Sequence, residues 1–196
     1  MLKKLLSSTS IAFLLLISFN NANSGAYNTS QYSANNDPSY SIMEAISKIK
    51  KFNSDTSNIP PAVVRSFLEK EIIPMFDFAI MARWITGPYV QYMSPSDQAD
   101  FFTNLKDTFL SSLSNHLGSF DSENTKIRYY PARYKHNGEA SVSVQVARPG
   151  KYPARLDFRM KRDGYNWKII DVKANGTSAV LHYRNHFMSQ LRQYGS

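Results

Sequence analysis

The chain offers few side chains with the types and spacing of a catalytic or metal site. His182 and His186 are four residues apart, so on a helix they would share one face, as a pair of zinc ligands does. The 196-residue sequence has no cysteine, and neither histidine belongs to an H-E-x-x-H motif. No third ligand is evident. We therefore expect two partly exposed helix histidines, with no metal, no catalytic residue and no cofactor.

Asp77 is the best candidate for a general base, because it lies between two aromatic residues, Phe76 and Phe78. Its simpler role is to cap the short helix that follows. Tyr183 is the only other residue that we can nominate for acid–base chemistry. The sequence contains neither a G-x-S-x-G motif nor a phosphate-binding loop. The alternatives that stay open are a small α+β pocket enzyme, isomerase- or hydrolase-like, and a non-catalytic module of the cell envelope.

The N-terminus reads as a targeting segment. Lys3 and Lys4 precede an apolar run from Ile11 to Ile17, which is typical of a secretory signal peptide and is shorter than the ~20 residues of a membrane span. We predict a signal peptide over 1–26, a mobile leader rich in Asn, Ser and Tyr over 27–38, and one domain over 39–196. The formal charge of +8 favours contact with anionic membrane surfaces over nucleic acid in an exported protein, although it could also serve solubility alone.

Helices are expected in the first part of this domain. Ser39 can cap a helix whose apolar residues recur at helical spacing, and Pro60-Pro61 opens a second helix that runs to about Ile73. A short buried helix should follow over 76–85. Ser94-Pro95 then starts a long helix that ends near Leu117.

From residue 127 onward the apolar period changes from 3.6 to 2. Val142, Val144 and Val146 alternate with polar residues, as do Leu156, Phe158 and Met160. Asn137-Gly138 and Asp163-Gly164 are hairpin turns, and Asn175-Gly176 leads from the strand at Trp167 into a last helix. The fold class is therefore α+β, with N-terminal helices packed on one face of a C-terminal antiparallel sheet of about four strands, and a final C-terminal helix.

Two blocks of residues carry a resemblance to a known family. The C-terminal block is Asp171, Gly176, Ser178, Arg184 and Phe187, and the other extends from Ile73-Pro74-Met75-Phe76-Asp77-Phe78 through Met81, Ala82, Arg83, Gly87, Ser94-Pro95, Gln98 and Phe101. Together they resemble the MlaC (toluene-tolerance auxiliary) family of periplasmic phospholipid-binding proteins, over most of residues 63–191. Pro88-Tyr89-Val90 departs from the family's pattern, which puts only a local turn in doubt.

The resemblance implies a periplasmic carrier that moves phospholipid between an outer-membrane lipoprotein–porin complex and an inner-membrane ABC transporter complex, and so maintains outer-membrane lipid asymmetry. Lys161, Arg162 and Lys173 would help it to approach these partners or an anionic membrane. Arg184 would either contact the lipid phosphate or pair with a carboxylate, while Asp171 and Ser178 fix the turn and the helix start. The acyl chains would lie between the apolar face of the sheet and the helices, lined by Phe76, Met81, Trp84, Phe101, Leu105, Phe109, Leu113, Val142, Val144, Val146, Leu156, Phe158, Met160, Trp167, Ile169, Tyr183 and Phe187.

Overall fold

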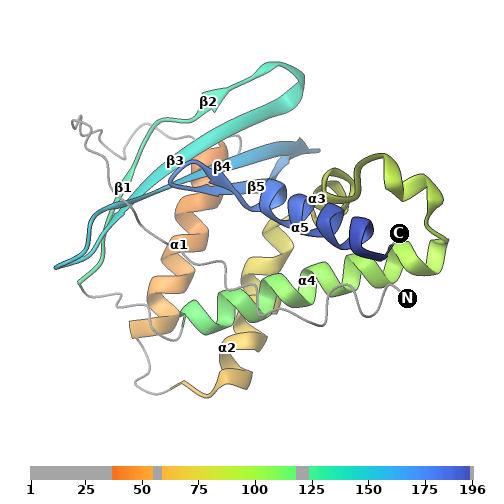
Figure 1. Ribbon diagram of the computed structural model, residues 1–196. Coiled ribbons are helices and arrows are strands. Elements are labelled where there is room, and N and C mark those ends of the chain that lie inside the picture. The colour runs from red at the N-terminus through yellow and green to blue at the C-terminus, as the bar shows by residue number, and fades with distance from the viewer. Residues whose placement is uncertain (1–36, 55–58, 118–123, 195–196) are drawn as a thin grey trace.

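Helices come first in the chain, an antiparallel sheet follows, and one helix ends it (Figure 1). The computed structural model describes residues 37–54, 59–117 and 124–194, so the signal peptide and most of the leader lie outside the described residues. The α-helices are α1 (Pro38–Ser54), α2 (Pro61–Phe67), α3 (Phe78–Thr86), α4 (Pro95–Leu117) and α5 (Ala179–Tyr194). Helix α2 continues through a π-helical turn, η3 (Leu68–Ile72), and a 3-10 turn, η4 (Ile73–Met75), and a 3-10 segment, η5 (Gly87–Tyr92), follows α3.

The sheet has six strands, of which the four longest match the strands expected from the alternating pattern. They are β1 (Lys126–Tyr129), β3 (Glu139–Ala147), β4 (Ala154–Asp163) and β5 (Asn166–Ala174). The order is β1-β3-β4-β5-β6, and β2 (Arg133–Tyr134) also pairs with β3. The strands β2 and β6 (Thr177–Ser178) have two residues each, too few to show a period of two.

Polar side chains set the helix starts. Asp77 accepts a hydrogen bond from the backbone N–H of Ile80 at 2.9 Å, so the predicted cap is confirmed and α3 begins at Phe78. Ser94 Oγ accepts from the N–H of Asp97 at 3.1 Å and starts α4. The prediction for α1 was wrong by two residues, because Asp37 accepts from the N–H of Ser39 at 2.8 Å and is the cap.

The helices cover the sheet in two groups. Helix α1 lies along one face of the sheet, whereas α3, α4 and α5 pack together beside it (Figure 1). At the crossing from β5 to α5, Asn175 and Gly176 have φ values of 48° and 88°, as the predicted tight turn requires. None of the described helices has the length and apolar content of a membrane span.

Candidate lipid-binding site

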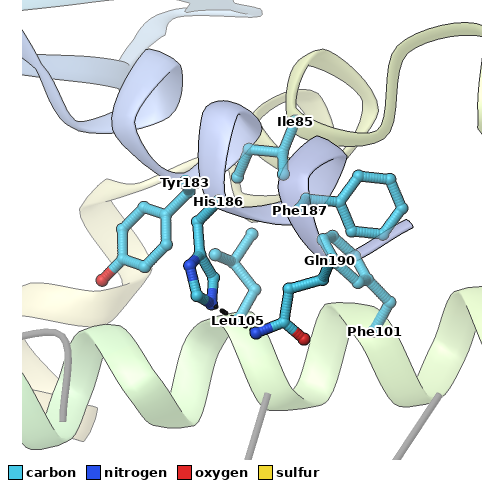
Figure 2. Close-up of a pocket in the computed structure, with 7 residues that line it drawn as sticks. All are labelled: Ile85, Phe101, Leu105, Tyr183, His186, Phe187 and Gln190. Carbon is cyan, nitrogen blue, oxygen red and sulfur yellow. Dashed lines mark hydrogen bonds between the residues drawn. The ribbon is translucent and has the colours of Figure 1, made fainter. Parts of the chain in front are cut away.

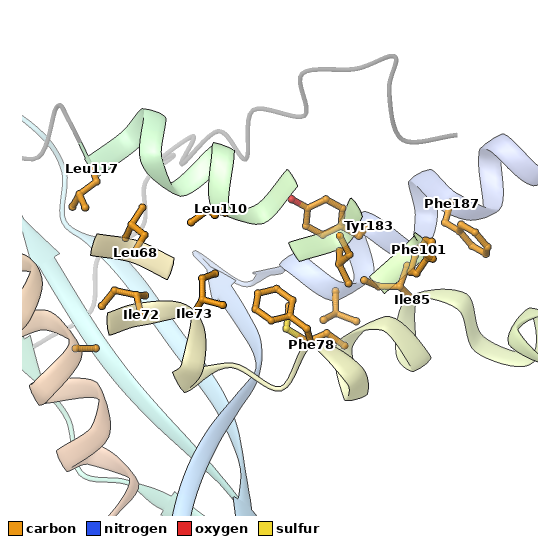
Figure 3. Packing of buried hydrophobic residues seen from close by; sticks show 14 of the residues in the cluster. Leu68, Ile72, Ile73, Phe78, Ile85, Phe101, Leu110, Leu117, Tyr183 and Phe187 are labelled. Carbon is orange, nitrogen blue, oxygen red and sulfur yellow. The ribbon is translucent and has the colours of Figure 1, made fainter. Parts of the chain in front are cut away.

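The apolar interior is divided into two clusters. The helical cluster draws on all five α-helices, with Ala45 from α1, and contains Leu68, Met81, Ile85, Leu105 and Leu110, each no more than 1% exposed (Figure 3). The sheet cluster contains Ile42 of α1 with Ala140, Val142, Val144 and Met160 of β3 and β4, also no more than 1% exposed. No described residue belongs to the fully buried part of both clusters.

Two half-buried side chains, Met75 and Phe76, pack against both clusters and form the junction between them. Their segment is tied to β5. Phe76 forms an isolated parallel bridge with Ile169, and the N–H of Asp77 donates to the carbonyl of Ile169 at 2.9 Å. Lys168 Nζ donates to the carbonyl of Pro74 at 2.6 Å. The junction is therefore fixed to the sheet by its backbone, while its side chains face the helical cluster as well.

Aromatic rings continue from the junction into the helical cluster. The centroids of Phe76 and Phe109 lie 4.8 Å apart, and those of Phe78 and Phe109 lie 5.5 Å apart. Phe109 follows Leu105 and Phe101 at four-residue intervals on α4, so these three side chains share one face of that helix. Further along, Phe101 meets Phe187 of α5 at 5.3 Å between ring centroids.

A small gap lies between α3, α4 and α5, next to this stripe (Figure 2). Its volume of about 10 Å³ has room for no more than one water molecule. The lining residues are Ile85, Phe101, Leu105, Tyr183, His186, Phe187 and Gln190. His186 Nε2 and Gln190 Nε2 are 3.0 Å apart, whereas the side-chain oxygen of Gln190 is buried with no hydrogen-bond partner among the described residues. The gap thus borders α5 on the side that carries Tyr183, His186 and Gln190.

The start of α5 is held much more firmly than the part that lines the gap. Asp171 is 5% exposed and accepts from Ser178 Oγ at 2.7 Å and from the N–H of Val180 at 3.2 Å. Ser178 Oγ in turn accepts from the N–H of Leu181 at 3.1 Å. These bonds satisfy backbone donors of the first turn and tie it to β5, which is the structural role expected for this pair.

Arg184 holds α5 to α3 through the backbone. Its Nη1 donates to the carbonyl of Trp84 at 3.1 Å, in the last turn of α3, where a cation is favourable. Gly87 follows with φ of 55°, and a Cβ there would lie 3.2 Å from Arg184 Nη2. The expected carboxylate partner is not observed among the described residues, because the guanidinium contacts this carbonyl instead. Arg159 covers the other side of Trp84, 4.5 Å from the ring centroid.

The residues predicted to line a pocket are divided among the gap, the junction, the sheet cluster and the rest of the helical cluster. Phe101, Leu105, Tyr183 and Phe187 line the gap, and Phe76 and Phe109 lie at or beside the junction. Val142, Val144, Met160, Trp167 and Ile169 are buried in the sheet cluster, with Val146 and Phe158 half-buried against it. Met81, Trp84 and Leu113 belong to the helical cluster, and Leu156 is half-buried on β4.

Sequence reasoning missed three gap-lining residues. Ile85 follows Met81 at four residues and could have been found from that spacing. His186 and Gln190 are polar, so a search for apolar stripes passes over them. Asp77 caps α3 and does not line the gap. Tyr183 does line it, and burial raises the pKa of its hydroxyl group. In the described part of the chain, no group of three or more His, Cys, Asp or Glu side chains could hold a metal ion.

Comparisons with known proteins agree with this fold. The family model described as MlaC protein matches residues 41–196. A solved structure, the phospholipid-binding protein from Ralstonia solanacearum in complex with a phospholipid, has a TM-score of 0.69 and 20% sequence identity, over 81% of this chain and 87% of that chain. A search of the curated proteins finds no match. Because the family model covers well over half of the sequence, this chain belongs to the MlaC family.

Proposed function

We propose that this chain is a periplasmic phospholipid carrier, and that it admits acyl chains into the divided apolar interior by moving helices α4 and α5. The observation that carries the proposal is the division itself, since Met75 and Phe76 are the two half-buried side chains among the described residues that pack against both buried clusters. A family whose solved relative binds a phospholipid makes this ligand class the first choice.

The magnitudes require that the acyl chains be enclosed. Exposing the acyl chains of a two-tailed lipid to water costs about 24 kcal/mol of free energy, for roughly 30 methylenes at about 0.8 kcal/mol each. A basic residue near an anionic head group contributes only about 1 kcal/mol. Charge can therefore guide the lipid, but only an apolar enclosure can retain it.

The same magnitudes explain why the interior is closed in the structure. An empty apolar cavity of some 500 Å³ would cost on the order of 12 kcal/mol, which is as large as the stability of a whole domain. Without a guest, the helices are expected to close on the sheet and leave little space, which is compatible with a gap of about 10 Å³ between α3, α4 and α5. Binding then means that a lipid replaces side-chain contacts between the helices.

The path we propose follows the inner face of α4. It starts at the gap beside Leu105, passes Phe109 one turn further along, and reaches the junction at Phe76. The part of α5 that borders the gap, from His186 to Gln190, moves to open it, while the hydrogen bonds of Asp171 keep the start of the helix on the sheet. Loading and release would be driven by the outer-membrane lipoprotein–porin complex and the inner-membrane ABC transporter complex, which would favour the open form.

Native mass spectrometry tests the proposal. Protein purified without detergent should carry one phospholipid per chain. Phe109→Ser should lower the lipid-bound fraction several-fold. The matched control is Phe52→Ser, since Phe52 is also half-buried in the helical cluster but stacks on Phe67, at 4.0 Å between ring centroids. Lipid-free protein that cannot take up phospholipid from vesicles would overturn the proposal, as would equal loss of lipid in both variants.

A further inference from the structure

One end of the sheet carries a concentration of basic side chains. We define the basic end as Lys126 and Arg128 of β1, Arg148 and Lys151 of the turn between β3 and β4, and Arg155 of β4. The turn lies on the opposite side of the molecule from the C-terminal end of α5 (Figure 1). The basic end is therefore well separated from the gap between the helices.

Strand pairing brings these residues together. Lys126 pairs with Ala147, next to Arg148, and the N–H of Lys151 donates to the carbonyl of Arg148 at 3.1 Å to close the turn. Arg128 and Arg155 both pair with Gln145, from its two sides. Their guanidinium carbons each lie 5.7 Å from the centroid of the Tyr130 ring, so two cations share one aromatic ring on this face.

The charge of the basic end is largely uncompensated by the described residues. Arg155 pairs with Asp157 at 2.9 Å, but no ion pair joins any of the other four to a described carboxylate. On the helical side, Lys48 pairs with Glu44 and Glu71, both at 3.0 Å. The basic end thus keeps a local excess of positive charge, namely the four cations beyond the pair of Arg155 with Asp157.

We infer that the basic end of the sheet docks on the surface of an anionic phospholipid bilayer. The positive charges are spread over two strands and an outer turn, an arrangement that suits an extended charged plane. Tyr152, 59% exposed beside the turn, supplies an aromatic ring of the kind enriched at membrane–water interfaces. The inference goes beyond the proposed function, because holding a lipid inside the protein does not require that the protein itself touch a membrane.

The residues expected from sequence to approach a membrane are not a single patch. Lys161 and Arg162 lie near the far end of β4, whereas Lys173 pairs with Asp157 about four residues away along the strands. Four residues of strand span roughly 13 Å. Lys161 and Arg162 are therefore suitable members of a charge-matched control, whereas Lys173 lies opposite Asp157, the ion-pair partner of Arg155 in the basic end.

Vesicle co-sedimentation of the full chain tests the inference. The test variant is Lys126→Gln/Arg148→Gln/Lys151→Gln, and the control, Lys135→Gln/Lys161→Gln/Arg162→Gln, removes the same charge from exposed positions at the other end of the strands. Each basic residue near an anionic surface raises the partition coefficient for the vesicle about fivefold. At low salt, the test variant should therefore bind vesicles containing phosphatidylglycerol roughly 100-fold more weakly than wild type. The control should lose less than about tenfold, and vesicles of phosphatidylcholine alone should bind none of the three proteins.

The outcomes separate this inference from the carrier proposal. Equal losses in the two variants, a larger loss in the control, or no binding of wild type to phosphatidylglycerol vesicles would overturn the docking surface. The phospholipid content of each protein, measured by mass spectrometry, reports on the interior instead. Both triple variants should retain wild-type lipid content, because none of their substitutions lies in the helical cluster.

Discussion

The sheet cluster and the helical cluster are buried to a similar degree but are held together by different forces. In the sheet cluster, Val142 and Met160 lie on strands joined by continuous backbone pairing, from Glu139↔Lys161 to Val146↔Ala154. In the helical cluster, α4 and α5 meet through side chains such as Phe101 and Phe187, beside a gap. Moving a strand breaks a ladder of hydrogen bonds, whereas moving a helix exchanges one set of apolar contacts for another. Under the proposed function, the helical cluster is therefore the half of the interior that would open for a lipid.

A matched pair of core substitutions gives the largest expected contrast. Ile169 in the sheet cluster and Ile85 beside the gap are 2% and 1% exposed. Replacing isoleucine by alanine costs about 2–5 kcal/mol, depending on how far the surroundings can relax. We expect Ile169→Ala near the top of that range and Ile85→Ala near the bottom, because helices bordering a gap can close over the deletion. Urea unfolding of both variants measures the difference, and equal losses would remove the contrast between the clusters.

The attachment of α5 to the sheet should give the next largest effect. Asp171→Ala leaves the Ser178 hydroxyl and the N–H of Val180 without their buried acceptor, which should lower the free energy of unfolding by about 2–3 kcal/mol. Asp171→Asn keeps one acceptor oxygen and should lose less. Lipid should also leave Asp171→Ala faster than wild type, since α5 would then lose the hydrogen bonds that tie its start to β5. Wild-type stability in Asp171→Ala would show that the sheet does not hold this helix.

Two tyrosines give the smallest effect and place one probe in each cluster. Burial raises the pKa of both Tyr129, beside the sheet cluster, and Tyr183, in the helical cluster. The stability that each contributes is fully present below the unfolded-state pKa of about 10 and is lost as pH rises through the higher folded-state pKa. Ultraviolet titration should show both tyrosine hydroxyls ionising at a higher pH than free tyrosine. The Tyr→Phe variant of each residue assigns its signal. Loading with phospholipid should change the titration of Tyr183 and leave that of Tyr129 unchanged. A change in Tyr129 alone would reverse the comparison.

The features that follow local rules could be predicted from the sequence. The alternation of Val142, Val144 and Val146 indicated β3, and the cap at Asp77 followed from residue type and position. The two-residue strands β2 and β6 are too short to show a period of two, although each pairs with a strand nearby in the sequence, β6 across the predicted Asn175-Gly176 turn. The π-helical turn after α2 has no local pattern of its own.

The details of the site depend on partners that are distant in the sequence. Our prediction gave Arg184 either a lipid phosphate or a carboxylate as its partner, yet in the structure it contacts the carbonyl of Trp84, a backbone group 100 residues away. The apolar stripe of α4 predicted Phe101 and Leu105, but periodicity cannot tell a residue that fills a core from one that borders a gap. The division into two clusters was likewise beyond sequence reasoning, because it depends on how Met75 and Phe76 cross between the helices and the sheet.

Hydrogen–deuterium exchange on lipid-free and phospholipid-loaded protein tests most directly whether the helical half opens while the sheet half stays closed. We expect exchange in α4 and in α5 beyond Phe187 to change on loading, and the amides of β3, β4 and β5 to keep the same protection in both forms. Changes in those strands as large as the changes in α4 and α5, or no change anywhere although lipid is bound, would contradict this mechanism.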